Sequence, residues 1–176
     1  ASVSGAVLGD DGAPPEAATV YFINSQLQAA QTRTDASGRY TINSLPTGWY
    51  RIWVNPSASD NYAPRHYPDQ AEFCDGTLLE VMDQHSNVDI VLPSGHTITG
   101  QVTEQDGSPI AGARIRAEST DGSVDRQTES GENGYFDIVG LEPSQEWIIQ
   151  AAKTGFPIQW YGDTYSDESA IVLSPN

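Results

Sequence analysis

The chain has 176 residues, which allows one or two domains. It carries 24 acidic residues against eight Lys and Arg, a formal net charge of −16, and this excludes the phosphates of nucleic acids and anionic lipid surfaces as natural partners. No stretch approaches the roughly 20 apolar residues of a membrane-spanning helix, so we expect no membrane insertion.

The first half of the chain is predicted to form strands, because its apolar residues alternate with polar ones between turn residues. The expected strands lie at residues 2–8, 17–23, 31–35, 38–45, 49–54, 77–82 and 87–92, with the polar 31–35 strand at an edge. Residues 55–76 are predicted to be irregular. A loop of that length is expected either to carry function or to pack as a flap.

The second half repeats the first. Gly100 lies 95 residues after Gly5, and Gly134 lies 96 after Gly38, a spacing typical of whole domains. We therefore expect two domains, 1–94 and 95–176, joined stiffly through the short segment 93–96. The expected strands of the second copy lie at residues 97–103, 111–117, 126–130, 134–141, 147–152 and 170–173.

The fold class expected from these patterns is all-β, since no stretch has helical periodicity over a useful length. The second copy has no counterpart of the 87–92 strand, so it is predicted to lack its last strand. A missing strand leaves an open edge that a neighbouring domain or the parent chain would cover.

Both copies carry a recurring string in which Gly-x-Val precedes a turn, then Gly-x-aromatic-x-Ile-x-x-Leu, then aromatic-x-Ile. In the first copy its residues are Gly5, Val7, Gly12, Val20, Gly38, Tyr40, Ile42, Leu45, Tyr50 and Ile52. In the second they are Gly100, Val102, Gly107, Pro109, Gly112, Ile115, Gly134, Phe136, Ile138 and Leu141. This string resembles the carboxypeptidase regulatory-like domain, a relative of the transthyretin (prealbumin-like) sandwich.

The resemblance implies two tandem seven-stranded Greek-key β-sandwich domains, the second incomplete. It also implies a chain without catalytic activity. Such domains are appended to secreted enzymes, adhesins and transporters as folding aids, spacers or binding modules.

Nothing in the sequence suggests a catalytic centre. There is no Gly-x-Ser-x-Gly string, and His66, His85 and His96 all fall in expected loops or strand starts. The single cysteine, Cys74, has no partner for an internal disulfide. We expect it to be a small packed residue, with a bond to another chain as the alternative.

No metal-binding motif is present, and we expect no cofactor. Loose acidic sets nevertheless leave calcium open as an alternative. They are Asp10 with Asp11, then Asp60 with Asp69 and Asp75, and finally Asp163 with Asp167 and Glu168. The competing interpretation is that these side chains cap backbone amides in turns.

The candidate ligand-binding site is the outer face of the first domain. If Tyr50, Ile52 and Val54 point inward, alternation turns Trp49, Arg51 and Trp53 outward. Tyr21 and Ile23 would likewise point outward from a neighbouring strand. The corresponding residues of the second copy are Arg114, Arg116, Ile148 and Gln150, so the aromatic patch is peculiar to the first domain.

Two interpretations of this patch stay open. Its rings can stack on sugars, since exposed aromatic patches call for an explanation. Alternatively, the 55–76 loop or the second domain covers the patch. A second aromatic group, His66-Tyr67 in one copy and Trp160, Tyr161 and Tyr165 in the other, is expected to plug each domain, with ligand binding as its alternative.

The sequence therefore predicts a non-catalytic spacer or adhesive tandem module of a secreted or surface-displayed multidomain protein. Its expected partners are other domains of that protein. The alternative is a carbohydrate-binding accessory module of a secreted hydrolase, which would contact polysaccharide through Tyr21, Trp49, Arg51 and Trp53.

Overall fold

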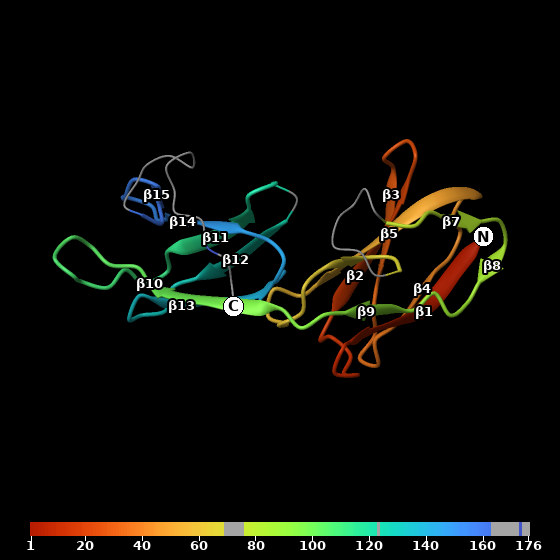
Figure 1. Cartoon of the computed structure of the whole chain (residues 1–176), viewed down its shortest axis with the longest axis horizontal. Helices are drawn as coiled ribbons and strands as arrows, with labels where there is room; N and C mark the ends of the chain where they lie inside the picture. Colours follow the sequence, from red (N-terminus) through yellow and green to blue (C-terminus); the bar gives the residue numbers. More distant parts are fainter. Residues whose placement is uncertain (69–75, 123, 163–172, 174–176) are drawn as a thin grey trace. The chain divides into compact units, whose positions relative to one another are not determined.

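A computed structural model of the chain describes residues 1–68, 76–122, 124–162 and 173. The chain divides into two compact units, Ala1–Ser94 and Gly95–Asn176 (Figure 1). The described residues of both units form β-strands joined by turns and loops, without a helix, which confirms the all-β class. In particular, the described residues contain no helix long and apolar enough to cross a membrane.

The first domain places two sheets face to face. Its strands are β1 Ser2–Gly9, β2 Ala18–Asn24, β3 Ala29–Arg33, β4 Arg39–Ile42, β5 Gly48–Pro56, β6 Arg65–His66, β7 Leu79–Val81, β8 Gln84–His85 and β9 Ile90–Leu92. One sheet has the order β4-β1-β8, with β9 also paired to β1. The other has the order β3-β2-β5-β6, with β7 also paired to β5.

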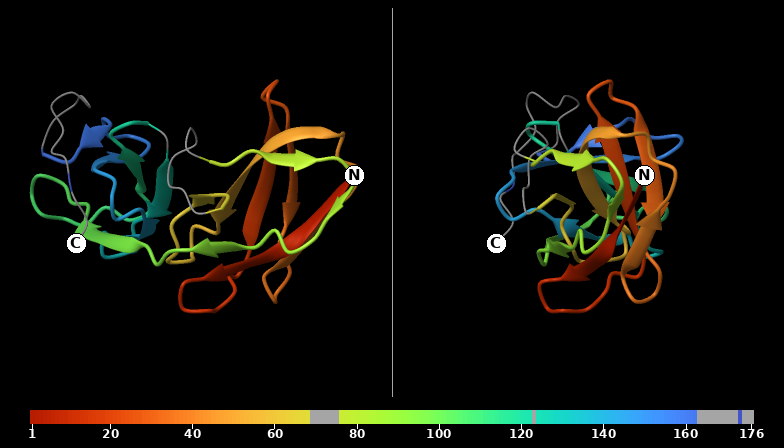
Figure 2. Two further views of the ribbon diagram at one scale, coloured as in Figure 1. Left: turned by 45° about the vertical axis from the view of Figure 1, so that its right-hand side comes forward. Right: turned by 90° about the vertical axis from the view of Figure 1, so that its right-hand side faces the viewer.

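The first and last strands of this domain lie side by side and run parallel (Figures 1 and 2). Val7 is opposite Ile90, and Gly9 is opposite Leu92. On its other edge β1 pairs antiparallel with β4, so β1 has neighbours on both sides. The pairing of β9 with β1 therefore joins the last strand of the domain to its first.

The core of the first domain lies between the two sheets and follows the alternation of the sequence. Val20 and Phe22 on β2 are fully buried, as are Ile52 and Val54 on β5. The aromatic ring of Tyr40 enters from the opposite sheet and is also buried.

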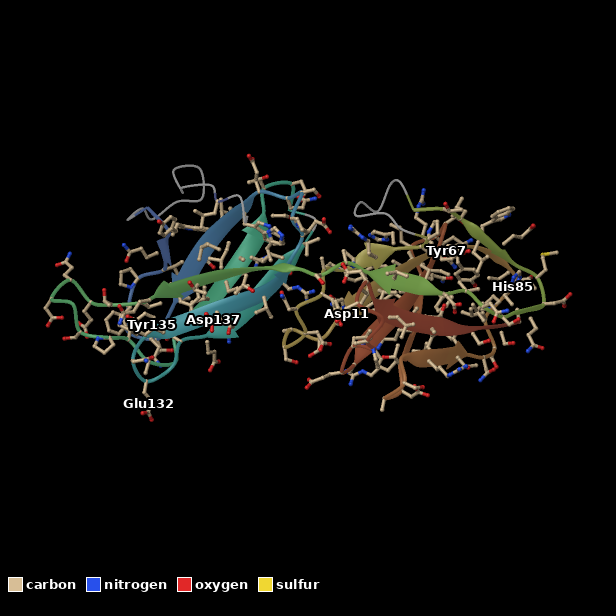
Figure 3. The ribbon with its side chains drawn as sticks, turned by 60° about the horizontal axis from the view of Figure 1, so that its bottom comes forward. Asp11, Tyr67, His85, Glu132, Tyr135 and Asp137 are labelled. Carbon is tan, nitrogen blue, oxygen red and sulfur yellow. The ribbon has the colours of Figure 1, made fainter. Side chains whose placement is uncertain are left out.

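Several strands of the first domain differ from the sequence-based expectation. β4 ends at Ile42, three residues before the end of the expected 38–45 strand, and β9 begins at Ile90, three residues after the start of the expected 87–92 strand. The edge strand begins and ends two residues earlier than the expected 31–35, at Ala29–Arg33. The expected irregular stretch contains β6, which pairs with β5 through Trp53 and Val54. The short β8 was also not expected. His66 therefore lies in strand β6 and His85 in strand β8 (His85 is labelled in Figure 3), rather than in loops. Alternation gives no signal for strands of two residues, which form only because a neighbouring edge is available to pair.

The described residues of the second domain repeat the plan of two sheets. Its strands are β10 His96–Gln101, β11 Arg114–Ser119, β12 Asp125–Glu129, β13 Tyr135–Leu141, β14 Trp147–Ala152 and β15 Gln159–Trp160. In the described residues β10 pairs with β13 alone, and the other sheet has the order β12-β11-β14-β15. Of the expected 170–173 strand, Leu173 is described and bridges to Trp147; the rest lies outside the described residues.

The described residues of the second domain form a core of their own. Ile115, Ile138, Leu141 and Trp147 are fully buried between its sheets. Along β10, however, Ile98 is only half-buried, whereas its counterpart in the first domain, Val3, is fully buried. The difference lies at the edge that β9 occupies in the first domain.

One glycine in each domain explains why the repeat is so visible in the sequence. Gly38 and Gly134 each have φ near +76°, a conformation that residues with a side chain rarely adopt. A Cβ atom on Gly38 would lie 2.3 Å from the Val7 carbonyl oxygen, and one on Gly134 would lie 2.5 Å from that of Val102. Both glycines are therefore required by the close approach of this turn to the first strand.

Candidate functional site

The candidate site is the outer face of the β3-β2-β5-β6 sheet, opposite the first domain's core. β2 and β5 are antiparallel neighbours, with Tyr21 opposite Trp53 and Ile23 opposite Arg51. Directly opposed residues project from the same face of a sheet. The fully buried Phe22 and Ile52 lie between them on the inner face, so the predicted outward orientation follows.

Three rings stack across the strands of this face. Tyr21 and Trp53 have ring centroids 5.0 Å apart and planes 25° apart. His66, opposite Trp53 on β6, continues the row with its ring 6.1 Å from Trp53 and inclined by 20°. We call His66, Trp53 and Tyr21 the ring stack. Offset stacking of this kind stabilises a pair by about 0.5–1.5 kcal/mol beyond the area buried.

Trp49 lies on the same face but outside the ring stack. It is two positions before Arg51 along β5, about 7 Å at the usual rise of a strand, and it is opposite Glu80 on β7. The Trp49 side chain is exposed, at 51% of its surface, whereas Tyr21, Arg51 and Trp53 are less exposed. The face thus combines a packed row of rings with one freely accessible indole.

His66 is the residue of this face that sequence patterns did not assign to it. It is buried, and its burial together with the nearby Arg51 guanidinium lowers the pKa of its imidazole to about 4. The ring is therefore neutral at pH 7, a form that stacks on Trp53 without a charge penalty. The sequence holds no signal for this contact, because it depends on the short pairing of β6 with β5.

The neighbouring Tyr67, labelled in Figure 3, lies on the core side of the first domain. It packs against the core of the first domain, and its backbone amide donates to the Ile52 carbonyl at 2.9 Å. The expected structural plug is thus divided, with Tyr67 on the core and His66 on the outer face.

The corresponding face of the second domain carries a different chemistry. Arg116 and Gln150 are Cα partners there, and Gln150 is opposite Trp160 on β15. Arg116 forms ion pairs with Glu118 at 3.1 Å and with Asp125 at 3.5 Å. Among the residues that the structure describes, the ring stack is therefore found in the first domain, and the second domain provides a natural comparison.

Acidic side chains of the first domain make local hydrogen bonds. The backbone amide and hydroxyl of Ser94 donate to Asp10 at 3.0 and 2.7 Å, and these bonds lower the pKa of Asp10. The Tyr62 hydroxyl donates to Asp11 at 2.9 Å (Asp11 is labelled in Figure 3). Within the described ranges no group of three or more His, Cys, Asp or Glu residues is placed to hold a metal ion.

Several residues of the sequence-based predictions lie outside the described residues. They are Asp69, Cys74, Asp75, Asp163, Tyr165, Asp167 and Glu168. The expected absence of a cofactor stays a prediction, with calcium binding at the acidic sets as its alternative.

Comparison with known families decides what the chain is. The carboxypeptidase regulatory-like domain matches residues 2–93 and again residues 97–171. The chain belongs to the carboxypeptidase regulatory-like domain family. The two matches confirm the resemblance read from the repeated string.

Among individual proteins, the chain is 28% identical over 156 residues to the chitinase ChiA of Flavobacterium johnsoniae, covering 88% of this chain and 9% of ChiA. The Bacillus anthracis TIE protein is similar in structure at 15% identity and a TM-score of 0.38, over 91% of this chain and 30% of that protein. A streptococcal ancillary pilin matches at 16% identity and a TM-score of 0.38, over 99% of this chain and 61% of the pilin. The chain therefore spans less than two thirds of each of these relatives.

The family motif marks structural positions in both carboxypeptidase regulatory-like domains. Gly5 and Gly100 lie in the first strands, and Tyr40 and Phe136 lie opposite them on β4 and β13. The residues of the ring stack and Trp49 are not motif residues, although β2 and β5, which carry Tyr21, Trp49 and Trp53, also carry motif residues. The candidate site is thus an addition to the family framework, and no motif could have predicted it.

Proposed function

We propose that the chain is a non-catalytic tandem module of a secreted or surface-displayed multidomain protein, and that it acts as a load-bearing spacer. The observation that carries this proposal is the parallel pairing of the first and last strands of the first domain, β1 and β9. Membership of the carboxypeptidase regulatory-like family supports the non-catalytic part of the proposal.

The strand direction explains why this pairing resists force. Tension on the chain draws β1 towards its N-terminus and β9 towards its C-terminus. Because the two strands are parallel, these pulls slide them past one another, and all of their hydrogen bonds are loaded together. Strands pulled apart from one end would instead lose their bonds one at a time at a lower force.

Single-molecule pulling of the full chain through its two ends tests the proposal. We expect two unfolding events, with the first domain breaking at the higher force. Each event should lengthen the tether by up to about 3.6 Å for every residue released. Leu92→Ala, which removes a fully buried β9 side chain, should lower the higher force alone. Ile149→Ala in the second domain is the matched control.

Two events at the same low force, or a higher force that Leu92→Ala leaves unchanged, would contradict a load-bearing role. In that case β1 and β9 would be an ordinary structural contact.

A second candidate function is polysaccharide binding by the first domain. It is favoured by the ring stack together with the exposed Trp49, since flat rings on a sheet face offer sugars an apolar surface. The relation to a chitinase, of which the chain spans 9%, supports an accessory module of a secreted hydrolase as the setting.

Retention on insoluble chitin and cellulose tests this candidate. If the face binds sugar, Trp49→Ala should abolish retention while leaving the melting temperature nearly unchanged, because the Trp49 side chain is half exposed. Tyr161→Ala removes an exposed ring from the second domain and should leave retention intact. A wild-type chain that is not retained, or a Trp49→Ala variant retained like wild type, would reject the binding surface and leave the spacer role.

A further inference from the structure

A small cavity lies at one end of the outer face of the β12-β11-β14-β15 sheet, where β11 begins and β14 ends. It measures about 370 Å³, which is near the lower end of the range of ligand pockets. The residues that line it all belong to the part of the chain that the structure describes: Gly112, Arg114, Glu129, Ala152, Lys153, Thr154 and Ile158. The cavity therefore suits a ligand of about the size of one sugar ring.

Three strand ends bring the charged side chains of this cavity together. Arg114 is the Cα partner of Glu129 on β12 and of Ala152 on β14, so the Arg114 and Glu129 side chains project from the same face. Lys153 follows Ala152 directly, and its ammonium donates to the Gly112 carbonyl at 3.0 Å. Two cations and one carboxylate thus border one cavity.

The Lys153 ammonium is held in a fixed place. Gly112 has φ +61°, and a Cβ atom on it would lie 2.9 Å from Lys153 Nζ, so glycine leaves the ammonium its room. The Gly112 amide donates to the Ser130 carbonyl at 2.8 Å, and the Ser130 hydroxyl donates to the Ile110 carbonyl at 2.7 Å. The turn that anchors Lys153 is thereby tied to the end of β12, and a site arranged in advance loses little freedom on binding.

The first domain has different residues at the positions of these charges. In the aligned registers of the two sheets, Thr19 and Arg33 are Cα partners in the first domain, as Arg114 and Glu129 are in the second. A neutral residue and a cation thus stand where the second domain has a cation and a carboxylate. The family framework therefore forms without the charges that border the cavity.

The first domain also makes the bond of Lys153 in another way. Ala17 lies two residues before its strand position as Gly112 does in the second domain, and the Ala17 carbonyl accepts from the Ser57 backbone amide at 2.9 Å. In the second domain the Lys153 side chain takes the place of that backbone donor. Lys153 is therefore an addition to the second domain that the sandwich itself does not need.

The two cations of the cavity have no carboxylate partner in the described part of the chain. Arg114 and Lys153 form no ion pair there, whereas Arg116, two positions along the same strand, pairs with Glu118 and Asp125. The net charge of −16 repels anions at long range, but at physiological salt this repulsion is screened beyond about 8 Å. A ligand inside the cavity therefore meets a local excess of positive charge.

We propose that this cavity binds a uronate, a sugar ring that carries a carboxylate. The Lys153 ammonium and the Arg114 guanidinium would bind the carboxylate through charge-assisted hydrogen bonds. The Glu129 carboxylate and the Thr154 hydroxyl would accept hydrogen bonds from the ring hydroxyls, and the exposed Ile158 side chain would contact the C–H groups of the ring. This site goes beyond the spacer role and does not depend on the ring stack of the first domain.

A titration of the isotopically labelled full chain with galacturonate, followed by the NMR shifts of its amides, tests the site. We expect saturable shifts at residues 112–114, 129 and 153–158, with a Kd on the order of 1 mM for a ligand with so few atoms. Galactose, which lacks the carboxylate, and acetate, which lacks the ring, should each bind at least tenfold more weakly. High salt should weaken the binding of galacturonate.

Lys153→Gln and Arg114→Gln should each weaken galacturonate binding at least tenfold, because each variant removes a charged donor to the carboxylate. Both side chains are exposed, so the variants should fold like wild type. Arg39→Gln is the matched control, since it removes the same charge from an exposed position of the first domain and should bind like wild type. Glu129→Gln should tighten the binding of acetate, because it removes the negative charge from the cavity.

The same titration distinguishes two sources of the uronate. Trigalacturonate that binds more tightly than galacturonate would assign the site to an acidic polysaccharide, and equal binding would assign it to a free sugar acid; both results support the site. Shifts that do not saturate, or galactose or acetate binding as tightly as galacturonate, would overturn the proposal. So would unchanged binding by Lys153→Gln, or an equal loss in Lys153→Gln and Arg39→Gln.

Discussion

At the scale of single residues, Tyr40 links the two ends of the first domain. Its ring is buried in the core, and its hydroxyl donates to the Val88 carbonyl at 2.7 Å, immediately before β9. Tyr40→Phe should lower the free energy of unfolding by about 1 kcal/mol, because the buried carbonyl loses its donor. Urea denaturation of the full chain measures this, and Tyr135→Phe, on an exposed ring, should change nothing. An unchanged midpoint for Tyr40→Phe would mean that water replaces the hydroxyl.

His66 gives the first domain a dependence on pH. Its pKa in the folded chain is about 4, below the ordinary value of 6.5, because burial and Arg51 disfavour the charged ring. Above pH 6.5 the ring is neutral in both states and the contribution to stability is complete. As the pH falls from 6.5 towards 4, the unfolded chain binds the proton first, so stability is lost at up to about 1.4 kcal/mol per pH unit.

The test compares unfolding at pH 7 and pH 5 in wild type and in His66→Gln. The variant should lose less stability than wild type over this interval, and the carboxylates common to both cancel in the comparison. His85→Gln on β8 should behave like wild type. If His66→Gln shows the full wild-type loss, then His66 titrates normally and is not buried in solution.

His66 also shows how far the outer face could be predicted from the sequence. Alternation at period two placed Tyr21, Arg51 and Trp53 on the outer face, since burial of Phe22 and Ile52 fixes the other face. It could not predict that His66 joins them. That contact arises from pairing across a loop, which leaves no periodic signal in the sequence.

At the scale of elements, β9 is held against β1 by a close backbone approach at Gly5. A Cβ atom there would lie 2.0 Å from the Val88 carbonyl oxygen, which belongs to the backbone and cannot rotate away. Gly5→Ala should therefore displace β9 and destabilise the first domain by about 1–3 kcal/mol or more. Hydrogen exchange should show the loss of protection concentrated at residues 88–92.

Gly100→Ala is the matched comparison, because the atom nearest its new methyl group belongs to the Phe136 side chain. That ring is half-buried and can turn aside, so the cost should be smaller. Equal destabilisation by the two variants would mean that β9 tolerates displacement, and would weaken the spacer proposal that depends on it.

The strands themselves were predictable to the extent that they are long and half-buried. β2, β5 and β14 lie within about two residues of their expected positions, because each alternates over at least six residues. The polar β3 was expected two residues late, since both of its faces carry small or polar side chains that do not fix a register. The two-residue strands β6, β8 and β15 depend on available edges and leave no pattern.

At the scale of the whole molecule, the described residues of the two domains form separate hydrophobic cores. The first includes Phe22, Tyr40 and Tyr50, while the second relies on Trp147 and on fewer buried residues among those described. Each core lies between the two sheets of its own domain, and the repeat in the sequence predicted both domains. Nothing in the sequence indicated that the Phe136 ring would lie over Gly100, where the Val88 backbone lies over Gly5 in the first domain.

Separate cores predict separate unfolding. Ile52 and Ile149 hold corresponding positions, opposite Phe22 and Ala117, and both are buried. Ile52→Ala should destabilise the first domain by about 2–5 kcal/mol, and Ile149→Ala should act similarly on the second. Calorimetry of the full chain should show each variant lowering one transition only.

The double variant completes this test. If the cores are independent, its two losses should add within about 0.5 kcal/mol, as they do for distant sites without shared partners. A single transition that both substitutions lower, or losses that fall well short of additive, would mean that one domain supports the other. The chain would then yield to force as one unit, and the two unfolding events expected of a tandem spacer would merge into one.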